Sequence, residues 1–409
     1  MRVTKKYLAA GVLAASAFAL VGCAPTAADG GDDAGGETAA PVSIGMITSQ
    51  TGPLAAYGEA YTAGFEAGLD YATDGTGTVD GRELDITWSD DQGNPDTAVS
   101  QAKDLIGQGT TILAGTVSSG IATALAEQAA QNQVLYISGP AAADAITGVN
   151  EYTFRSGRQT YQDVATAGTF IGDAAGKSVV VFAQDTAFGQ GNLAGVEAVL
   201  GGQGATVDGV LVAEDATEFT PFAQQLIDAE PDLIFVAWAG ASSGAMWTAL
   251  QQQGVFDVAP VVTGLGDVAT YGAYGDASGD ISFLNHYFAG ASGSDAEAAM
   301  LEYLESEGMV GDLFSPDGFL AAQMIVEAVR AGDSVDDMIA ALIGEARAEM
   351  LARIDQGRID DVAEAFRAVI ELTGENGLDA LLDEAVQNRS KLVDFLRNLN
   401  PANDRRAHY

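Results

Sequence analysis

The sequence predicts an α/β fold built on parallel β-sheets. Short β-branched, apolar runs alternate with segments of helical periodicity from Val42 to about Leu342. The runs are nearly continuous in apolar residues, which is typical of strands in a sheet that helices cover on both faces. The pattern extends over about 300 residues, a length that favours two domains over one.

The predicted strands follow one another with helical segments between them. The clearest helix start is Asn94-Pro95-Asp96, which supplies an N-cap, a proline in the first turn and an acid near the positive end of the helix. The strands are predicted at Val42–Thr48, Leu84–Ser89, Thr111–Val117, Val134–Ser138, Ser178–Ala183, Val207–Val212, Leu233–Trp238, Pro260–Thr263 and Ile281–Tyr287.

The N-terminus has the order of parts of an exported lipoprotein. Basic residues at positions 2, 5 and 6 precede an apolar run that is too short for a permanent membrane-spanning helix. Residues 20–23 read Leu-Val-Gly-Cys, which resembles the lipobox of bacterial lipoproteins and implies cleavage before Cys23 and acylation of its sulfur. The alternative is a buried or free cysteine after an ordinary signal peptide.

We therefore expect residues 1–23 to be a signal peptide with a lipobox. Residues 24–40 carry no large apolar side chain and are expected to form a flexible linker. The mature protein is expected outside the cytoplasm, anchored to the cell membrane through lipid on Cys23.

The charge balance limits the partners. The chain has 57 acidic and 18 basic side chains. A surface this negative repels nucleic-acid phosphates and anionic lipid headgroups, so neither a nucleic-acid partner nor electrostatic membrane docking is expected.

The loops after the predicted strands are rich in small residues, notably at 49–58, 115–120 and 138–143. Ligands of open α/β sheets bind beyond the carboxyl ends of the strands, where these loops lie. Backbone amides at a helix start, with the hydroxyls of Ser118 and Ser119 beside them, suit a carboxylate. The alternative is that these serines only cap their own helix.

Several segments carry a family resemblance through their order and spacing. They are residues 44–68, the Asp90-Asp91 pair followed by Asn94-Pro95, the loop 115–120, the turn 184–191 and Phe-Thr-Pro-Phe at 219–222. Together they resemble the Leu/Ile/Val-binding family of extracellular solute-binding proteins of ABC importers, over about residues 41–342.

The resemblance implies a type I periplasmic-binding-protein fold. This fold has two Rossmann-like lobes with parallel central sheets, joined by a multi-strand hinge that the chain crosses three times. The implied bounds are 41–155 for the first part of lobe I, 156–283 for lobe II and 284–342 for the second part of lobe I. The lobes would close on an amino acid or a related small molecule, and the partners would be ABC permease subunits.

The resemblance also implies ligand-binding positions. Tyr57 falls where an aromatic wall residue is usual, and Ser119, with Ser118 beside it, falls where a hydroxyl meets the ligand carboxylate. Ala141 falls where a backbone carbonyl accepts from an α-ammonium group. Phe188 falls where an aromatic ring of the second lobe closes over the ligand.

Other positions depart from the family pattern. Ala142 or Ala143 stands where a threonine hydroxyl is usual. The acid that pairs with the α-ammonium falls near Gly266, so Asp267 takes its place only if the loop shifts by one residue. Trp238, or the backbone that follows it, replaces a tyrosine of the second lobe. These departures put a branched-chain ligand in doubt.

Arg155 and Arg158 stand out in so acidic a chain, near the expected first crossover. Arg158 is a candidate clamp for a second carboxylate of the ligand, because a guanidinium binds a carboxylate with two parallel hydrogen bonds. The alternative is an ion pair within the hinge.

The parts needed for catalysis are missing. Residues 172–178 resemble a phosphate loop but have one residue too few between the glycines, and the last glycine of 189–195 is one place late for a dinucleotide motif. Histidine occurs only at positions 286 and 408, so zinc, thiol and serine-histidine chemistry lack residues. Asp90 and Asp91 point to opposite faces and are interpreted as strand-end residues. No enzyme activity, metal or cofactor is expected.

The last part of the chain, residues 343–409, departs from this pattern. It is richer in Lys and Arg and has helical periodicity, so an all-helical C-terminal segment is expected. A gene fusion or reading-frame change, a lineage-specific appendage and a divergent closing segment all remain open.

The sequence thus favours a lipid-anchored binding protein that delivers a small polar organic solute, most simply an amino acid, to an ABC permease. Hinge closure on the ligand would shift the population to the closed state. The alternatives are an extracytoplasmic sensor for amino acids, amides or small carboxylates, and an enzyme of the doubly wound type.

Overall fold

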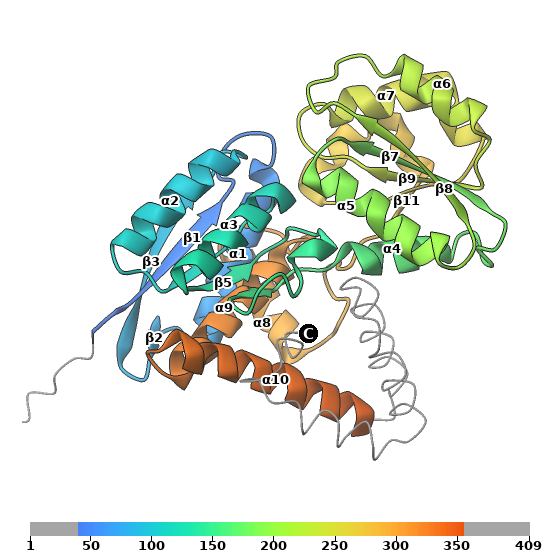
Figure 1. Cartoon of the computed structure of the whole chain (residues 1–409). Helices are drawn as coiled ribbons and strands as arrows, with labels where there is room; N and C mark the ends of the chain where they lie inside the picture. The colour runs from blue at the N-terminus through green and yellow to red at the C-terminus, as the bar shows by residue number, and fades with distance from the viewer. Residues whose placement is uncertain (1–39, 356–409) are drawn as a thin grey trace, which may run out of the picture. The chain divides into compact units, whose positions relative to one another are not determined.

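The computed structural model describes residues 40–355, and the first of its two β-sheets holds six strands (Figure 1). The strand order is β2-β3-β1-β4-β5-β6, and all neighbours are parallel except the β2–β3 pair. The strands are β1 (Val42–Thr48), β2 (Thr78–Val79), β3 (Arg82–Asp90), β4 (Ile112–Ala114), β5 (Leu135–Ser138) and β6 (Thr153–Arg155).

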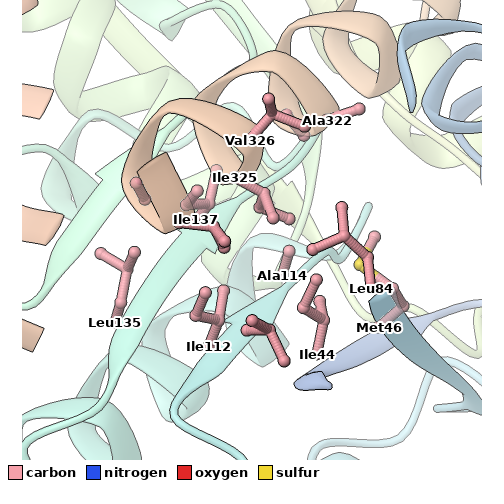
Figure 2. Close-up of a cluster of buried hydrophobic side chains, with 14 of the residues drawn as sticks. Ile44, Met46, Leu84, Ile112, Ala114, Leu135, Ile137, Ala322, Ile325 and Val326 are labelled. Atoms are coloured by element: carbon pink, nitrogen blue, oxygen red, sulfur yellow. The ribbon is translucent and has the colours of Figure 1, made fainter. Parts of the chain in front are cut away.

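Helices cover both faces of this sheet because its strands are apolar on both sides. Figure 2 shows one face, where Ile44, Ile112 and Ile137 of the strands lie against Ile325 and Val326 of α9. The other face packs on α2 and α3. The helices of this lobe are α1 (Ala55–Ala72), α2 (Pro95–Gly107), α3 (Ser119–Asn132), α8 (Asp295–Ser306), α9 (Ser315–Ala331) and α10 (Val335–Asp355).

The second sheet has five parallel strands in the order β11-β10-β9-β7-β8. They are β7 (Ser178–Gln184), β8 (Thr206–Val212), β9 (Leu233–Ala237), β10 (Val261–Thr263) and β11 (Ile281–Phe283). One face packs on α4 (Thr160–Gly168) and α5 (Ala187–Val196), and the other on α6 (Thr220–Asp228) and α7 (Ser243–Gln253). The shorter helical turns are η1 (Asp144–Ile146), η2 (Glu197–Gly201), η3 (Val255–Asp257), η4 (Val268–Ala273) and η5 (Gly275–Gly279).

The chain passes between the two sheets twice within residues 40–355. β6 belongs to the first sheet and ends at Arg155. The next helix, α4, packs against α5, which covers the second sheet. β11 ends at Phe283, and the chain then returns to α8, which packs against α1. These two strand ends coincide with the bounds expected for lobe II, 156–283, so we use the names lobe I and lobe II. A third crossing does not occur in this part of the chain.

The parallel α/β prediction is confirmed, with corrections at some strands. β2 and β6 were not predicted. The strand predicted to reach Val117 ends at Ala114, because Gly115 turns the backbone out of the strand at φ +107°. The strand predicted to reach Tyr287 ends at Phe283, where the chain leaves the sheet.

The expected boundary at residue 343 does not coincide with the end of an element. α10 is one continuous helix from Val335 to Asp355, and Ile343 is buried with Met338 and Leu342. Residues 343–355 are therefore part of a helix that packs on the core of lobe I. The signal peptide, Cys23, residues 24–39 of the linker and residues 356–409 lie outside the described residues. In the part that is described, no helix has the length and apolar character needed to cross a membrane.

Helices α1 and α9 are in unusually close contact. A Cβ atom at Gly64 of α1 would lie 1.9 Å from the carbonyl oxygen of Ser315 in α9. A Cβ atom at Gly318 of α9 would lie 2.0 Å from the carbonyl oxygen of Tyr61. The two glycines thus let one helix backbone rest directly on the other, which fixes the start of α9 and with it the adjacent Phe314.

Candidate functional site

A cleft of about 750 Å³ lies at the carboxyl ends of strands from both sheets. This is the edge at which the sequence analysis placed the ligand. Its walls come from the loops after β1, β4 and β5 of lobe I and after β7, β8 and β9 of lobe II. The predicted residues that line it are Tyr57, Ser118, Ser119, Ala142, Arg158 and Phe188.

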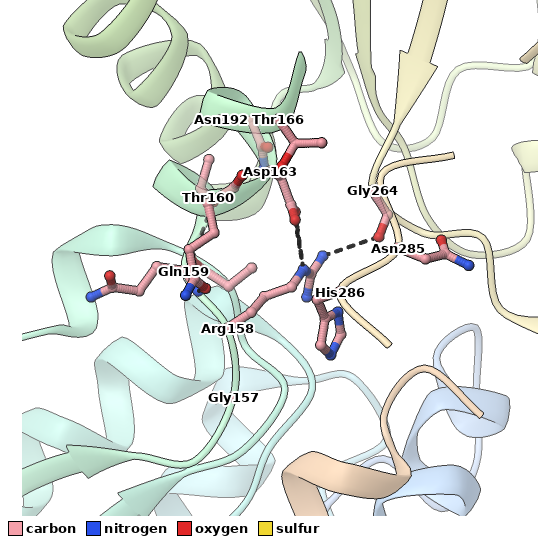
Figure 3. A network of polar contacts seen from close by, with 12 residues as sticks. Gly157, Arg158, Gln159, Thr160, Asp163, Thr166, Asn192, Gly264, Asn285 and His286 are labelled. Carbon is pink, nitrogen blue, oxygen red and sulfur yellow. Dashed lines mark hydrogen bonds and ion pairs between the residues drawn. The ribbon is translucent and has the colours of Figure 1, made fainter. Parts of the chain in front are cut away.

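Arg158 is the best-defined charged group of the cleft. It is 6% exposed, and its Nε donates to both carboxylate oxygens of Asp163 at 2.9 and 3.2 Å. Nη2 donates to the carbonyl oxygen of Gly264 at 3.3 Å, whereas Nη1 has no hydrogen-bond partner. Figure 3 shows the guanidinium between α4 and the loop after β10, with His286 beside it. The ion pair that was the alternative role for this arginine is present, and the clamp on a ligand carboxylate stays a prediction.

The same side chain also lines a second pocket, of about 470 Å³, at the crossing between the lobes. His286 and Asp317 line this pocket too, with 3.4 Å between Nε2 of His286 and Oδ1 of Asp317. Burial raises the pKa of Asp163 even though Arg158 lies beside it.

Ser118 and Ser119 stand at the start of α3 on the cleft wall. Ser118 is the N-cap residue, but its side chain makes no capping hydrogen bond. The buried Oγ of Ser119 accepts from the backbone N–H of Ala143 at 3.2 Å, which leaves its own proton free to donate. The capping alternative is therefore not what the structure shows for either serine.

Aromatic and aliphatic side chains form the rest of the wall. Tyr57 and Phe314 meet edge to face with ring centroids 5.2 Å apart, and the Arg158 guanidinium lies 5.7 Å from the centroid of the Phe314 ring. Phe188 of lobe II packs against the same apolar cluster, which also contains Leu265. Burial raises the pKa of Tyr57 to about 12, so its hydroxyl is neutral in ordinary buffers.

Ala141 and Ala143 do not line the cleft. The carbonyl oxygen of Ala141 accepts from Nη2 of Arg155 at 2.6 Å, so the acceptor expected for an α-ammonium group already has a donor. Ala143 is buried, and its N–H and carbonyl bind Ser119 and Arg155. Both alanines support the cleft from behind.

Arg155 does not form the ion pair that was considered for it. Its guanidinium donates to the carbonyl oxygens of Gly157, Arg158, Ala141 and Ala143 and to the hydroxyl of Thr147. Burial lowers the pKa of Arg155 to about 10. It thus braces the chain where β6 leaves lobe I.

Trp238 lies in the core of lobe II instead of the cleft. Its ring stacks on Phe182 with centroids 5.2 Å apart and meets Phe219 edge to face at 5.3 Å. Only its Nε1 approaches the cleft wall, donating to Ser242 at 3.1 Å. Residues 239–241, which follow Trp238, line the cleft, so the other option, a ligand contact by this segment, stays a prediction.

Asp267 does not line the cleft either. It is fully buried, and its Oδ1 caps η4 by accepting from the N–H of Thr270 at 3.2 Å. Burial and the nearby carboxylate of Asp312 raise its pKa to about 7. The acid expected to face a ligand ammonium group is thus buried and does not line the cleft, although its Oδ2 has no hydrogen-bond partner.

The raised pKa of Asp267 has a consequence for stability. Between about pH 4 and about pH 7 the folded protein binds more protons at Asp267 than the unfolded chain, so this group lowers the free energy of unfolding as the pH rises. Asp267→Asn is expected to come close to the parent near pH 4 and to melt a few degrees higher near pH 8. Thermal melts at both pH values test this, with the exposed Asp280→Asn as the control for loss of one charge. An equal shift at both pH values would contradict it.

Asp90 and Asp91 are structural, as predicted. Oδ1 of Asp90 accepts from the N–H groups of Gln50 and Thr51 at 2.9 and 3.1 Å. The buried Asp91 accepts from the hydroxyls of Ser49 and Thr116. The pair holds the loop after β1 from two sides.

Several cleft residues were not predicted. Asp185, Glu214 and Asp215 are exposed acids of lobe II on the cleft wall, and Gln184 lies beside them. Gln184 and Asp185 belong to a turn that the sequence analysis had singled out, so its place after β7 was a usable signal. Phe314 had no local signal, because it reaches the cleft from the loop before α9.

Metal-binding geometry is also missing from the described residues. No group of three or more histidine, cysteine, aspartate or glutamate side chains in this part of the chain is arranged to hold a metal ion.

Two parallel-sheet lobes, with a cleft that combines an aromatic cluster, one buried arginine and helix-start hydroxyls, define a solute-binding protein of the two-lobed class. The sequence matches the family model for periplasmic binding proteins over residues 41–374, and the chain belongs to this family. The match extends past Leu342, where the sequence analysis placed the end of the resemblance.

Comparisons with individual proteins agree. The chain is 24% identical over 304 residues to Leu/Ile/Val-binding protein homolog 3 of Brucella melitensis, which covers 74% of this chain and 82% of the relative. It is 32% identical to a solved ABC-type branched-chain amino acid transporter of Rhodopseudomonas palustris, with a TM-score of 0.59 and coverage of 73% and 83%. A solute-binding protein of R. palustris in complex with 4-hydroxybenzoate shares 21% identity and the fold, with a TM-score of 0.64 and coverage of 74% and 84%.

The chain is therefore a periplasmic binding protein of the ABC-transporter type. The family consists of solute-binding proteins and not of enzymes, and membership places the protein outside the cytoplasm.

Proposed function

We propose that this protein captures a small organic acid, either an amino acid or a related carboxylate, in the cleft between its lobes and delivers it to an ABC permease. The observation that carries the proposal is Arg158, a buried cation on the cleft wall whose Nη1 nitrogen has no hydrogen-bond partner. The Ser119 hydroxyl and the α3 amides beside it add further donors. Relatives named for branched-chain amino acids and a fold neighbour with bound 4-hydroxybenzoate have ligands with this group.

A thermal-shift screen of the purified protein tests the ligand class. Amino acids, their amides and simple carboxylates are added in turn, and a ligand at a hundredfold its Kd stabilises the fold by about 2.7 kcal/mol. We expect hits among carboxylates and none among the amides. Hits confined to amides or sugars would contradict the proposal.

Uptake measurements test the role in transport. Deleting the gene should abolish high-affinity uptake of a ligand found in the screen, and restoring it should recover uptake. If the deletion strain took up the ligand normally but lost its transcriptional response to it, the protein would instead be an extracytoplasmic sensor.

We further propose that lipid on Cys23 anchors the protein to the cell membrane. The support is the order of basic residues, apolar run and Leu-Val-Gly-Cys at residues 20–23. Cys23→Ser should abolish labelling with a fatty-acid analogue and move the protein from the membrane fraction to the soluble fraction. Cys23→Ser protein that stays on membranes would point to an uncleaved signal helix.

A further inference from the structure

The cleft offers a ligand carboxylate a cation but offers an α-ammonium group little. Among the described residues that line it, Arg158 is the only lysine or arginine. No aspartate or glutamate of lobe I in residues 40–355 lines the cleft, and Asp267 is buried away from it with Oδ1 capping η4. The acids that do line it, Asp185, Glu214 and Asp215, belong to lobe II and are exposed to water.

Three backbone carbonyls of this region already accept hydrogen bonds from the protein. The carbonyl oxygen of Ala141 accepts from Arg155 at 2.6 Å, and that of Leu265 accepts from the hydroxyl of Tyr274 at 2.5 Å. The carbonyl oxygen of Ala142 accepts from the N–H of Thr160 at 2.9 Å and from its hydroxyl at 3.2 Å. A carbonyl oxygen that already accepts a hydrogen bond from the protein has less acceptor capacity left for a ligand ammonium group, and that of Ala142 accepts two.

The covalent structure of an amino acid makes it a poor match for this cleft. Its ammonium and carboxylate groups are attached to the same carbon, so a carboxylate held by Arg158 brings the ammonium group close to a buried guanidinium. A buried ammonium group without a partner is costly, and the Arg158 guanidinium, which is paired with Asp163, offers it no acceptor. A carboxylate without that ammonium group meets no such cost.

The rest of this part of the cleft suits an apolar group on the ligand. Tyr57, Phe314, Leu265 and Phe188 form one apolar cluster with residues from both lobes, and the Arg158 guanidinium lies over the Phe314 ring. A ring or branched chain attached to the carboxylate would replace water against these side chains.

We infer that the cleft selects small aromatic or branched aliphatic carboxylates that lack an α-ammonium group, with Nη1 of Arg158 as the principal carboxylate donor. The inference rests on the proposed function and narrows its ligand class. Nη1 is covered in this structure. Contact with a ligand therefore requires a small rearrangement at the crossing between the lobes, where Arg158 also lines the second pocket.

Matched ligands test the inference on the full chain in detergent. One set is 3-phenylpropanoate, L-phenylalanine and 2-phenylethylamine, and the other is 4-methylpentanoate, L-leucine and isopentylamine. Within each set only the charged groups differ. Calorimetry should give a Kd for the simple carboxylate at least about tenfold lower than for the amino acid, and no binding of the amine.

Variants test the role of Arg158. Arg158→Lys keeps the charge but loses the fork of donors, and Arg158→Gln with Asp163→Asn removes both charges together and so leaves no unpaired buried ion. Either variant should weaken binding of the simple carboxylate by about tenfold or more. The paired variant keeps the test valid if Arg158→Lys fails to fold.

The outcomes separate the inference from the proposed function. Amino acids that bind at least as tightly as the simple carboxylates would overturn the inference and leave the proposed function intact. If Glu214→Gln or Asp215→Asn then abolished amino-acid binding, the ammonium group would be bound by these acids of lobe II. Carboxylate binding that is unchanged in the paired variant would also overturn it. If amines alone bind, the proposed function fails as well.

Discussion

Replacing Asp163 by alanine is expected to lower the free energy of unfolding by about 3–5 kcal/mol, because it leaves a buried guanidinium without its counter-ion. Arg158 and Asp163 have side chains only 3% and 6% exposed, with 2.9 Å between Nε and Oδ2. The remaining partner of Arg158 is the single carbonyl of Gly264. Urea unfolding of the parent and the variant measures the loss.

The chain supplies a matched control for this prediction. Lys177 and Asp232 form an ion pair at the same 2.9 Å distance, but their side chains are 41% and 37% exposed. Asp232→Ala should therefore cost much less than Asp163→Ala, since water solvates the lysine left behind. Similar losses in the two variants would show that the hinge ion pair is solvated in solution.

Gly64→Ala is expected to be the second strongly destabilising change. The added Cβ would lie 1.9 Å from the Ser315 carbonyl oxygen and 2.8 Å from the Ser315 Cα, so backbone must move to admit it. Overpacking of this kind costs about 1–3 kcal/mol or more. Because Phe314 precedes α9 on the cleft wall, ligand affinity should fall together with the melting temperature.

Gly344→Ala is the control for the glycine substitution. Gly344 lies inside α10, is exposed, and has nothing within 4 Å of its added Cβ. Alanine there should raise the free energy of unfolding by about 0.5–1 kcal/mol, because it favours the helix without a new contact. If Gly64→Ala lowered the free energy of unfolding no more than Gly344→Ala does, α1 and α9 would not be in the close contact described above.

Strands with uniform apolar character were predicted well from sequence. The predicted limits of Val42–Thr48 agree with β1, and those of most other strands agree within one or two residues. β6 was missed because Thr153–Arg155 is short and ends in an arginine, and β2 because it has only two residues. Their strand conformation depends on neighbours in the sheet and not on local sequence.

The cleft was predictable where a residue directly follows a strand or starts a helix. Ser118, Ser119 and Phe188 are such residues, and the direction of the parallel strands alone brings them to one edge. Sequence position did not reveal where a side chain points. Trp238 follows the apolar strand β9 and continues its packing into the core, whereas Asp267 is directed by the cap of η4.

The acid pair that ends β3 affects the thermodynamics of capture. Asp90 and Asp91 already bind the amides and hydroxyls of the loop at residues 49–51. A loop with its polar groups paired beforehand gives up little conformational entropy when a ligand arrives. The β1 loop should therefore contribute little to the entropy lost on binding, in contrast to parts of the cleft wall whose polar groups are unpaired.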